Sequence, residues 1–176
     1  VAAPVAELLH APLDVFIARK LGAPGHEELG IGAVAADGTR VLDDALVTVL
    51  RVTDSYIEKV TKFELAEAKR RLSLFRGARE PAPLRDRIVI LVDDGLATGG
   101  TARAALKVLG AEGSSRLVFA APVASMDGAE SIAAMKIATV FSAVPKHFHG
   151  VGEWYESFDQ VSDEEVLALL AEAAAR

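Results

Sequence analysis

The sequence predicts an α/β fold with a mainly parallel sheet flanked by helices. Residues 88–92 (IVILV) form a continuous aliphatic run, which is typical of a central parallel strand covered on both faces. Two further apolar runs, at 117–121 and 137–144, alternate with segments of helical pattern at 102–109 and 127–136. Strands that alternate with helices favour a doubly wound sheet.

The segment before this sheet is less regular. Residues 1–9 predict a helix, with Pro4 in its first turn and a shared apolar face made of Val1, Val5, Leu8 and Leu9. Residues 13–18 predict a short buried strand, and the glycines and proline of 21–30 predict a mobile loop. A strand is expected at 31–35, then a tight turn at Asp37-Gly38 and a returning strand at 39–42.

An inserted helical segment is predicted at about 44–76, ending at Gly77. Its expected buried side chains are Tyr56, Ile57, Val60, Phe63, Leu65, Leu72 and Phe75. Acidic residues are interspersed with its basic ones, which favours a solvated face over an RNA-binding surface. The basic residues in question are Lys69, Arg70, Arg71, Arg76 and Arg79.

The C-terminal part is expected to be a cover and a helix, at 145–176. Ser162 begins the final helix, and Glu165 three residues later completes a capping box. The chain is therefore predicted as one domain, 1–176, with its core at about 1–42 and 87–144.

Composition excludes several classes of function. The 176 residues carry a formal net charge of −6, which disfavours a general binder of nucleic acid or anionic membrane. There is no cysteine, so a disulfide scaffold, a cysteine-ligated metal and a thiol nucleophile are excluded. No apolar run approaches the length of a membrane span, and a cytoplasmic location is expected.

The motif that carries chemistry is IVILVDDGLATGGT, residues 88–101. An apolar strand is followed by Asp93 and Asp94, and then by a loop of small residues that opens a helix. The loop comprises Ala97, Thr98, Gly99, Gly100 and Thr101. Its backbone N–H groups, its hydroxyls and the helix dipole predict a site for a phosphate monoester. Two carboxylates would repel phosphate but suit the adjacent hydroxyls of a sugar or a metal ion on the ligand. The pairing implies a ribose 5-phosphate.

This motif resembles the signature of the type I phosphoribosyltransferases, which has four apolar residues, two acids and a loop ending in T-G-x-T. A second match is V-F-I-A-R-K at 15–20, because the family follows an early strand with Arg-Lys and a flexible loop. The resemblance covers most of the chain and is strongest from 87 to 125. It is closest to a bacterial group of phosphoribosyltransferases with unassigned substrates.

The resemblance implies roles for the matching residues. Asp93 and Asp94 would hold the ribose hydroxyls of 5-phosphoribosyl 1-pyrophosphate, and 97–101 would hold its 5-phosphate. Arg19 and Lys20 would act as catalytic cations at the pyrophosphate, and Mg²⁺ would bridge substrate oxygens near the acid pair. Ala97 stands where purine 6-oxo transferases carry an aspartate, which argues against a hypoxanthine–guanine enzyme and leaves the general base unassigned.

Other side chains are weaker candidates. Lys146, Trp154 and Tyr155 fall where this family covers the nucleobase, and they are expected base contacts, with core packing as the competing interpretation of the aromatic pair. His147 and His149 lack a third ligand nearby, so a solvated loop is favoured over a metal site.

The function expected from the resemblance is transfer of a phosphoribosyl group to a nitrogenous acceptor such as a nucleobase, in nucleotide salvage, with release of pyrophosphate. The alternatives are a non-catalytic domain that senses phosphoribosyl pyrophosphate or nucleotides, and a general nucleotide- or sugar-phosphate-binding domain. The expected partners are small molecules; neither membrane nor nucleic acid is expected, and a homodimer is left open.

The beginning of the sequence carries one further expectation. The resembling family has a strand and a pyrophosphate-binding loop before its first helix, and this sequence opens at Val1 on that helix. The expectation is that the chain as given lacks this start and binds the 5-phosphate better than it catalyses transfer. A partner chain that fills the gap is the alternative.

Overall fold

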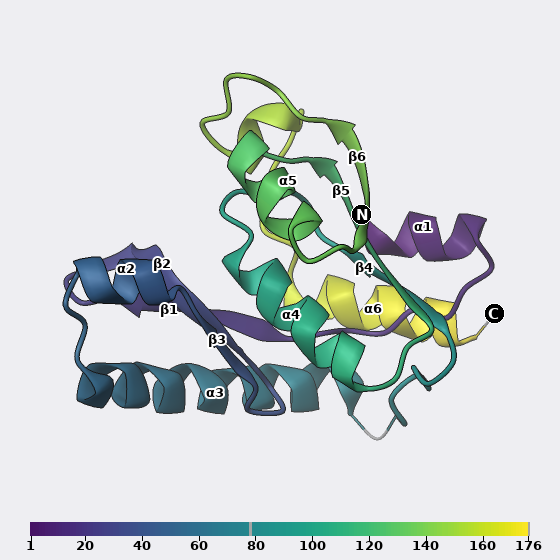
Figure 1. Ribbon diagram of the computed structural model, residues 1–176. Coiled ribbons are helices and arrows are strands. Elements are labelled where there is room, and N and C mark those ends of the chain that lie inside the picture. Colours follow the sequence, from purple (N-terminus) through teal and green to yellow (C-terminus); the bar gives the residue numbers. More distant parts are fainter. Residues whose placement is uncertain (78, 176) are drawn as a thin grey trace.

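The computed structural model describes residues 1–77 and 79–175 (Figure 1). The elements in chain order are α1 (Ala2–Leu8), β1 (Ala18–Ala23), β2 (His26–Ala35), β3 (Arg40–Leu42), α2 (Asp44–Val49), α3 (Asp54–Arg76), β4 (Ile88–Val92), α4 (Gly100–Ala111), β5 (Arg116–Val123), α5 (Met126–Ala133), β6 (Ala138–Ala143), the 3-10 helix η1 (Val151–Trp154) and α6 (Asp163–Ala174).

The strands β4, β5 and β6 form a parallel sheet in that order, which confirms the predicted α/β class. One face of this sheet is closed by α4 and α5. Phe119 of β5 is fully buried there with Leu106 of α4 and Ile132 of α5, and its ring lies 6.0 Å from that of Phe141. This core fixes the positions of the two strand-to-helix loops that follow β4 and β5.

The strands β1, β2 and β3 form a second, antiparallel sheet. Figure 1 shows α4 between the two sheets and α3 along the outer side of the antiparallel one. Ala33 of β2 packs on Ala104 of α4, whereas Val34 packs with Ile57 of α3. The helix that follows the candidate phosphate loop is therefore held from both sides.

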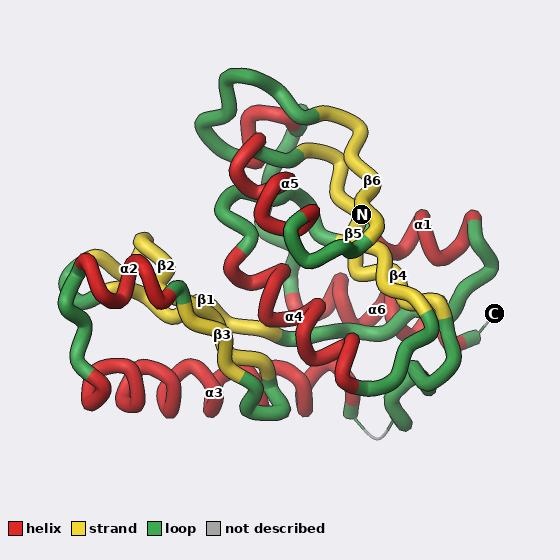
Figure 2. Tube along the Cα trace, in the orientation of Figure 1, coloured by secondary structure: helices red, strands yellow, loops and turns green. Residues whose placement is uncertain are grey.

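Two predictions for the first sheet are wrong. Residues 13–17 form no strand, and the segment between α1 and β1 is mostly loop (Figure 2). Residues 21–30, predicted as a mobile loop, belong mainly to a hairpin of β1 and β2 that turns at Pro24 and Gly25. The hairpin pairs over most of its length, and the Tyr56 hydroxyl of α3 donates a 3.1 Å hydrogen bond to the carbonyl of Gly22.

The helical segment at 44–76 is confirmed, although residues 50–53 divide it into α2 and α3. Gly77 follows the last residue of α3 at a φ of 56°, the left-handed region that suits glycine. The prediction that Phe63 is buried is wrong, because its exposed fraction is 70%. The hairpin covers only one side of α3, and Ile57 lies on that side. Phe75, near the end of α3, is also buried.

The prediction that strand 88–92 is covered on both faces is also wrong. Ile88 and Ile90 are 64% and 36% exposed, and Val140 of β6 is 60% exposed. Their register places them on the face of the parallel sheet that is opposite to α4 and α5. Leu91, on the other face of β4, packs against the buried core.

The predicted final helix and its capping box are confirmed. Ser162 caps α6, its hydroxyl accepts from the Glu165 N–H, and the Glu165 carboxylate accepts from the Ser162 N–H. No helix in the described residues is long and apolar enough to cross a membrane.

Candidate functional site

The loop from Ala97 to Thr101 lies at the carboxyl end of β4, where ligands bind in open α/β sheets. Ala97, Thr98 and Thr101 are exposed, and α4 begins at Gly100. In the described structure no side chain caps the first turn of α4, so its leading N–H groups are available to an anion. The structure therefore presents the donors that the sequence predicted.

Gly99 is the residue that turns the loop into the helix. Its φ of 75° lies in the left-handed region, and a Cβ there would lie 2.5 Å from the Ser131 hydroxyl oxygen of α5. Its carbonyl accepts the first hydrogen bond of the helix, 2.8 Å from the Arg103 nitrogen. A side chain at this position would force the loop away from α5.

The loop is held from behind by the segment that joins β5 to α5. The Leu96 N–H donates to the Val123 carbonyl at 2.9 Å, and the Ser125 N–H donates back to Leu96 at 2.8 Å. The Ser125 hydroxyl donates to the carbonyl of Ala97 at 2.5 Å. These bonds extend the parallel pairing of β4 and β5 beyond β4 itself, with a bridge between Leu96 and Ala124.

The acid pair stands between the strand and this loop. Asp93 is partly buried, and one of its carboxylate oxygens accepts from the Asp94 N–H at 2.9 Å; Asp94 is more exposed. Burial raises the pKa of Asp93, and the neighbouring Asp94 charge raises it further. Burial also raises the pKa of Asp94. Hydroxyl donors or a cation would stabilise the charged forms of both groups.

The carboxylates fit a divalent cation only in part. Their oxygens are the ligands that Mg²⁺ prefers. However, the described residues contain no group of three histidine, cysteine, aspartate or glutamate side chains that could hold a metal. Asp93 and Asp94 could therefore supply a fraction of a coordination shell, and substrate oxygens would have to supply the rest.

The segment at 151–158 packs directly on the acid pair. The Tyr155 hydroxyl donates to the main-chain carbonyl of Asp94 at 2.6 Å, and the Tyr155 and Phe158 rings lie 5.1 Å apart. A Cβ on Gly95 would lie 2.4 Å from Val151, so only glycine permits this close approach. A cavity of about 390 Å³ lies between the acid pair and this segment, lined in part by Tyr155 and Phe158.

The three predicted base contacts are not equivalent in the structure. Tyr155 is partly buried, and burial together with the Asp94 and Asp93 charges raises its pKa. Trp154 is 46% exposed, and Lys146 is exposed. The Trp154 ring is thus partly open to contact a ligand, whereas the Tyr155 hydroxyl is already bonded to the acid-pair backbone.

Arg19 and Lys20, the two predicted catalytic cations, are neighbours on β1 of the antiparallel sheet, and their side chains leave opposite faces of it. Arg19 donates to Glu64 of α3 at 2.8 Å, on the α3 side of β1. Lys20 is exposed and pairs in register with Ala33, which packs on α4, so it lies on the α4 side. Arg19 and Lys20 therefore lie on opposite faces of the antiparallel sheet.

His147 and His149 are exposed, and the four arginines at 70–79 are bonded within the protein. Among the residues that the structure describes, no metal-binding cluster includes either histidine. Arg70 and Arg71 pair with Glu67, Arg76 pairs with Asp14, and Arg79 donates to the carbonyl of Leu170. The Arg70 and Arg71 pairs agree with the predicted solvated, ion-paired face. Arg76 and Arg79 differ from it, because they are half-buried and bond to distant segments of the chain.

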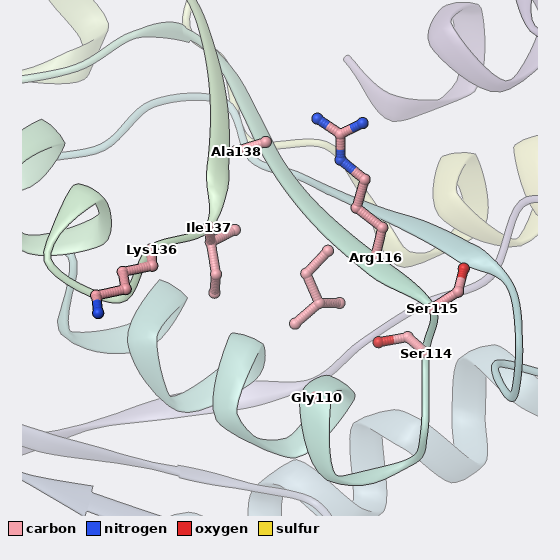
Figure 3. Close-up of a pocket in the computed structure, with 8 residues that line it drawn as sticks. Gly110, Ser114, Ser115, Arg116, Lys136, Ile137 and Ala138 are labelled. Carbon is pink, nitrogen blue, oxygen red and sulfur yellow. The ribbon is translucent and has the colours of Figure 1, made fainter.

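A larger cavity, of about 430 Å³, lies at the amino ends of β5 and β6, remote from the candidate site (Figure 3). Figure 3 shows Arg116 and Lys136 pointing away from one another rather than toward a shared ligand. Because ligands of parallel α/β sheets bind at the carboxyl ends of the strands, the candidate site is the one at the end of β4, where the smaller cavity is lined by the acid pair.

Three residues that contact the loop were not among the sequence-predicted site residues: Ser125, Gly128 and Ser131. A helix start at Ser125 could have been recognised from serine before the 127–136 helical pattern. The hydrogen bond from the Ser125 hydroxyl to the Ala97 carbonyl depends on the pairing of β5 with β4. No local sequence pattern predicts that pairing.

Comparisons with known proteins agree with this geometry. Residues 1–156 match the phosphoribosyl transferase domain family. Two curated relatives from Mycobacterium tuberculosis, of strains CDC 1551 and H37Rv, are each described as "Putative phosphoribosyl transferase" and are 42% identical over 173 residues. The alignment covers 98% of this chain but only 39% of each relative, so the chain spans well under half of their length.

A solved structure is similar as well. The crystal structure of TT1426 from Thermus thermophilus superposes with a TM-score of 0.80 at 40% sequence identity, covering 97% of this chain and 81% of that one. The fold, the loop at the end of β4 and the match over residues 1–156 lead to the same assignment. The chain belongs to the phosphoribosyl transferase domain family.

Proposed function

We propose that this domain binds 5-phosphoribosyl 1-pyrophosphate and transfers its phosphoribosyl group to a nitrogenous acceptor. The observation that carries the proposal is the uncapped start of α4, with the Ala97–Thr101 loop tied back to α5 and the acid pair directly before it. The positions of the loop and of the acid pair along the chain suit one ligand that has a phosphate at one end and vicinal hydroxyls beside it.

The loop would bind the 5-phosphate through the N–H groups that open α4, supported by the Thr98 and Thr101 hydroxyls. Asp93 and Asp94 would accept hydrogen bonds from the ribose hydroxyls. A carboxylate that accepts from a hydroxyl replaces part of the solvation it loses on burial, which offsets the cost that raises the pKa of Asp93.

The reaction is a substitution at the anomeric carbon. The acceptor nitrogen forms a bond to this carbon as the bond to the pyrophosphate oxygen breaks, and pyrophosphate leaves with that electron pair. A nitrogen that carried a proton passes it to a base, which we do not assign to a side chain. Negative charge grows on the leaving group, so cations placed there accelerate the step.

Lys20 is the cation that we propose for the pyrophosphate, because its position on β1 faces α4. Arg19 would reach a ligand only after leaving Glu64. Mg²⁺, when bound near Asp93 and Asp94 through substrate oxygens, would neutralise part of the pyrophosphate charge.

The Arg19–Glu64 ion pair also supports a second candidate, a domain that senses phosphoribosyl pyrophosphate without turning it over. A sensor needs the phosphate loop and the acid pair but not a full set of cations at the leaving group. Both the transferase and the sensor should bind phosphoribosyl pyrophosphate, but only the transferase should release pyrophosphate from it.

The test is a binding measurement followed by a transfer assay. Calorimetry with ribose 5-phosphate, 5-phosphoribosyl 1-pyrophosphate and ATP should show the two ribosyl ligands bound more tightly than ATP. A panel of nucleobases and small amines, with Mg²⁺, then reports pyrophosphate release. Release with one acceptor establishes the transferase, binding without release favours the sensor, and no preference over ATP contradicts both.

A further inference from the structure

We propose that Ser125 is a positioning residue for the phosphate loop, and that it acts by aiming the N–H of Thr98 at the ligand. The inference rests on the proposed function. It concerns a residue outside the loop, at the start of α5, whose hydroxyl is bonded to the loop backbone.

The argument begins with the Ser125 hydroxyl, which makes two hydrogen bonds. As the cap of α5, its oxygen accepts from the Gly128 N–H at 2.9 Å. The same hydroxyl donates to the Ala97 carbonyl at 2.5 Å. A single side chain thus joins the first turn of α5 to the first residue of the phosphate loop.

The carbonyl of Ala97 and the N–H of Thr98 belong to one peptide plane. No peptide bond in the described chain is cis, so these two groups point in opposite directions. Because the carbonyl points toward Ser125 and α5, the Thr98 N–H must point away from α5, toward the exposed side of the loop. Fixing the acceptor end of the plane therefore fixes the donor end.

Packing by α5 reinforces this orientation. A Cβ on Gly128 would lie 2.3 Å from the Ala97 carbonyl oxygen, and a Cβ on Gly99 would lie 2.5 Å from the Ser131 oxygen. The Ser131 hydroxyl in turn donates to the Gly128 carbonyl at 2.8 Å. The first two turns of α5 form a close-fitting support beneath the loop, with the Ser125 bond as its polar contact to residue 97.

The experiment compares four proteins: wild type, Ser125→Ala, Ser125→Thr and the control Ser162→Ala. Ser162→Ala removes the equivalent cap of α6, so it reports the general effect of losing a serine cap without touching the loop. Ribose 5-phosphate affinity is measured by calorimetry, and the Thr98 amide is followed by ¹⁵N NMR during the same titration. Thermal melts show which variants remain folded.

We expect Ser125→Ala to bind ribose 5-phosphate about tenfold more weakly, the effect of one misdirected hydrogen bond to a charged group. The Thr98 amide should shift downfield with ligand in wild type and much less in this variant. Ser125→Thr keeps the hydroxyl and should retain most of the affinity, and Ser162→Ala should match wild type within about twofold.

Several results would overturn the proposal while the proposed function stands. These are wild-type affinity in Ser125→Ala, an unaltered Thr98 shift in that variant, or equal losses in Ser125→Ala and Ser125→Thr. If Ser125→Ala does not fold, the ribose 5-phosphate affinities of Gly128→Ala and Gly110→Ala are compared instead. A Cβ at Gly128 would press on the Ala97 carbonyl, whereas a Cβ at Gly110 meets only an ordinary contact at 3.5 Å and serves as the control. Equal affinity in that pair overturns the proposal. If wild type fails to bind ribose 5-phosphate, the proposed function itself has failed.

Discussion

The two sheets of this molecule use their polar groups differently. In the parallel half, the chain after β4 leaves backbone donors and two carboxylates at an accessible strand end, while the loop carbonyl at Ala97 is bonded from behind. In the antiparallel half and its helix α3, two arginines are instead bonded to carboxylates of the protein itself. Arg19 pairs with Glu64 and Arg76 with Asp14.

The difference teaches which sequence signals indicate a binding site. The loop of small residues after β4 leaves the first N–H groups of α4 without a side-chain cap, so they are available to an external partner. An arginine carries no such implication, because any nearby carboxylate or carbonyl satisfies it. Four predictions test this contrast, beginning with the largest expected effect.

The acid pair should carry the largest effect. Asp93→Ala/Asp94→Ala removes two acceptors of ribose hydroxyls, each worth about 1.5–3 kcal/mol where the hydrogen bond is charged, so ribose 5-phosphate affinity should fall by at least about 100-fold. Calorimetry measures the ribose 5-phosphate affinity. The control is Asp37→Ala, which removes a carboxylate from the turn between β2 and β3. An unchanged affinity in the double variant would remove the ribose assignment.

Substitutions in the loop should discriminate between phosphorylated and unphosphorylated ligands. Thr98→Val or Thr101→Val removes one hydroxyl donor and should weaken ribose 5-phosphate about tenfold, the lower end of a bond to a charged group. Unphosphorylated ribosides should be spared. Equal losses for both ligand types would mean that the hydroxyls only maintain the loop.

The two cations of β1 should behave differently. Lys20→Ala should weaken 5-phosphoribosyl 1-pyrophosphate by several-fold to about tenfold while sparing ribose 5-phosphate, because Lys20 lies on the α4 side. Arg19→Ala should instead lower the melting temperature, as should Glu64→Gln, because both lose the same ion pair. The distinction between the two faces of β1 fails if Arg19→Ala weakens the pyrophosphate ligand as much as Lys20→Ala does.

The smallest effect is expected on the surface of α3. Hydrogen bonds from Arg70 and Arg71 lower the pKa of Glu67 from 4.5 to about 2. A lowered pKa means that this charge stabilises the fold above about pH 4.5 and that the contribution is lost as pH falls toward 2. Glu67→Gln should therefore lower the melting temperature slightly at pH 7 and not at pH 2.

Glu58→Gln, on the same helix, is the control for that measurement. Exposed pairs contribute little, so a shift of a few degrees at most is expected. A difference between Glu67→Gln and wild type that persists unchanged at pH 2 would show that the ion pairs are not its source.

Local patterns determined much of the fold and of the site. The β-strand at 88–92, the turn at Asp37-Gly38, the end of α3 at Gly77 and the cap at Ser162 were all predictable. Each depends on a few consecutive residues: an aliphatic run, a left-handed glycine or a serine with a glutamate three residues on. The loop at 97–101 was predictable for the same reason.

What only the tertiary structure decided depends on contacts between distant segments. Residues 21–30 look like a loop because of their glycines, yet pairing between β1 and β2 and packing against α3 and α4 make them a hairpin. The exposure of Phe63 follows from which side of α3 the hairpin covers.

The candidate site divides in the same way. Its acids, its loop and its helix start lie within one short stretch of sequence, so a local pattern was enough to predict these residues. The bond from Ser125 to Ala97, the hydroxyl of Tyr155 on Asp94 and the Arg19–Glu64 pair each join residues 28 or more positions apart. Such contacts arise only once strand order and helix packing bring those segments together, because no short-range periodicity encodes them.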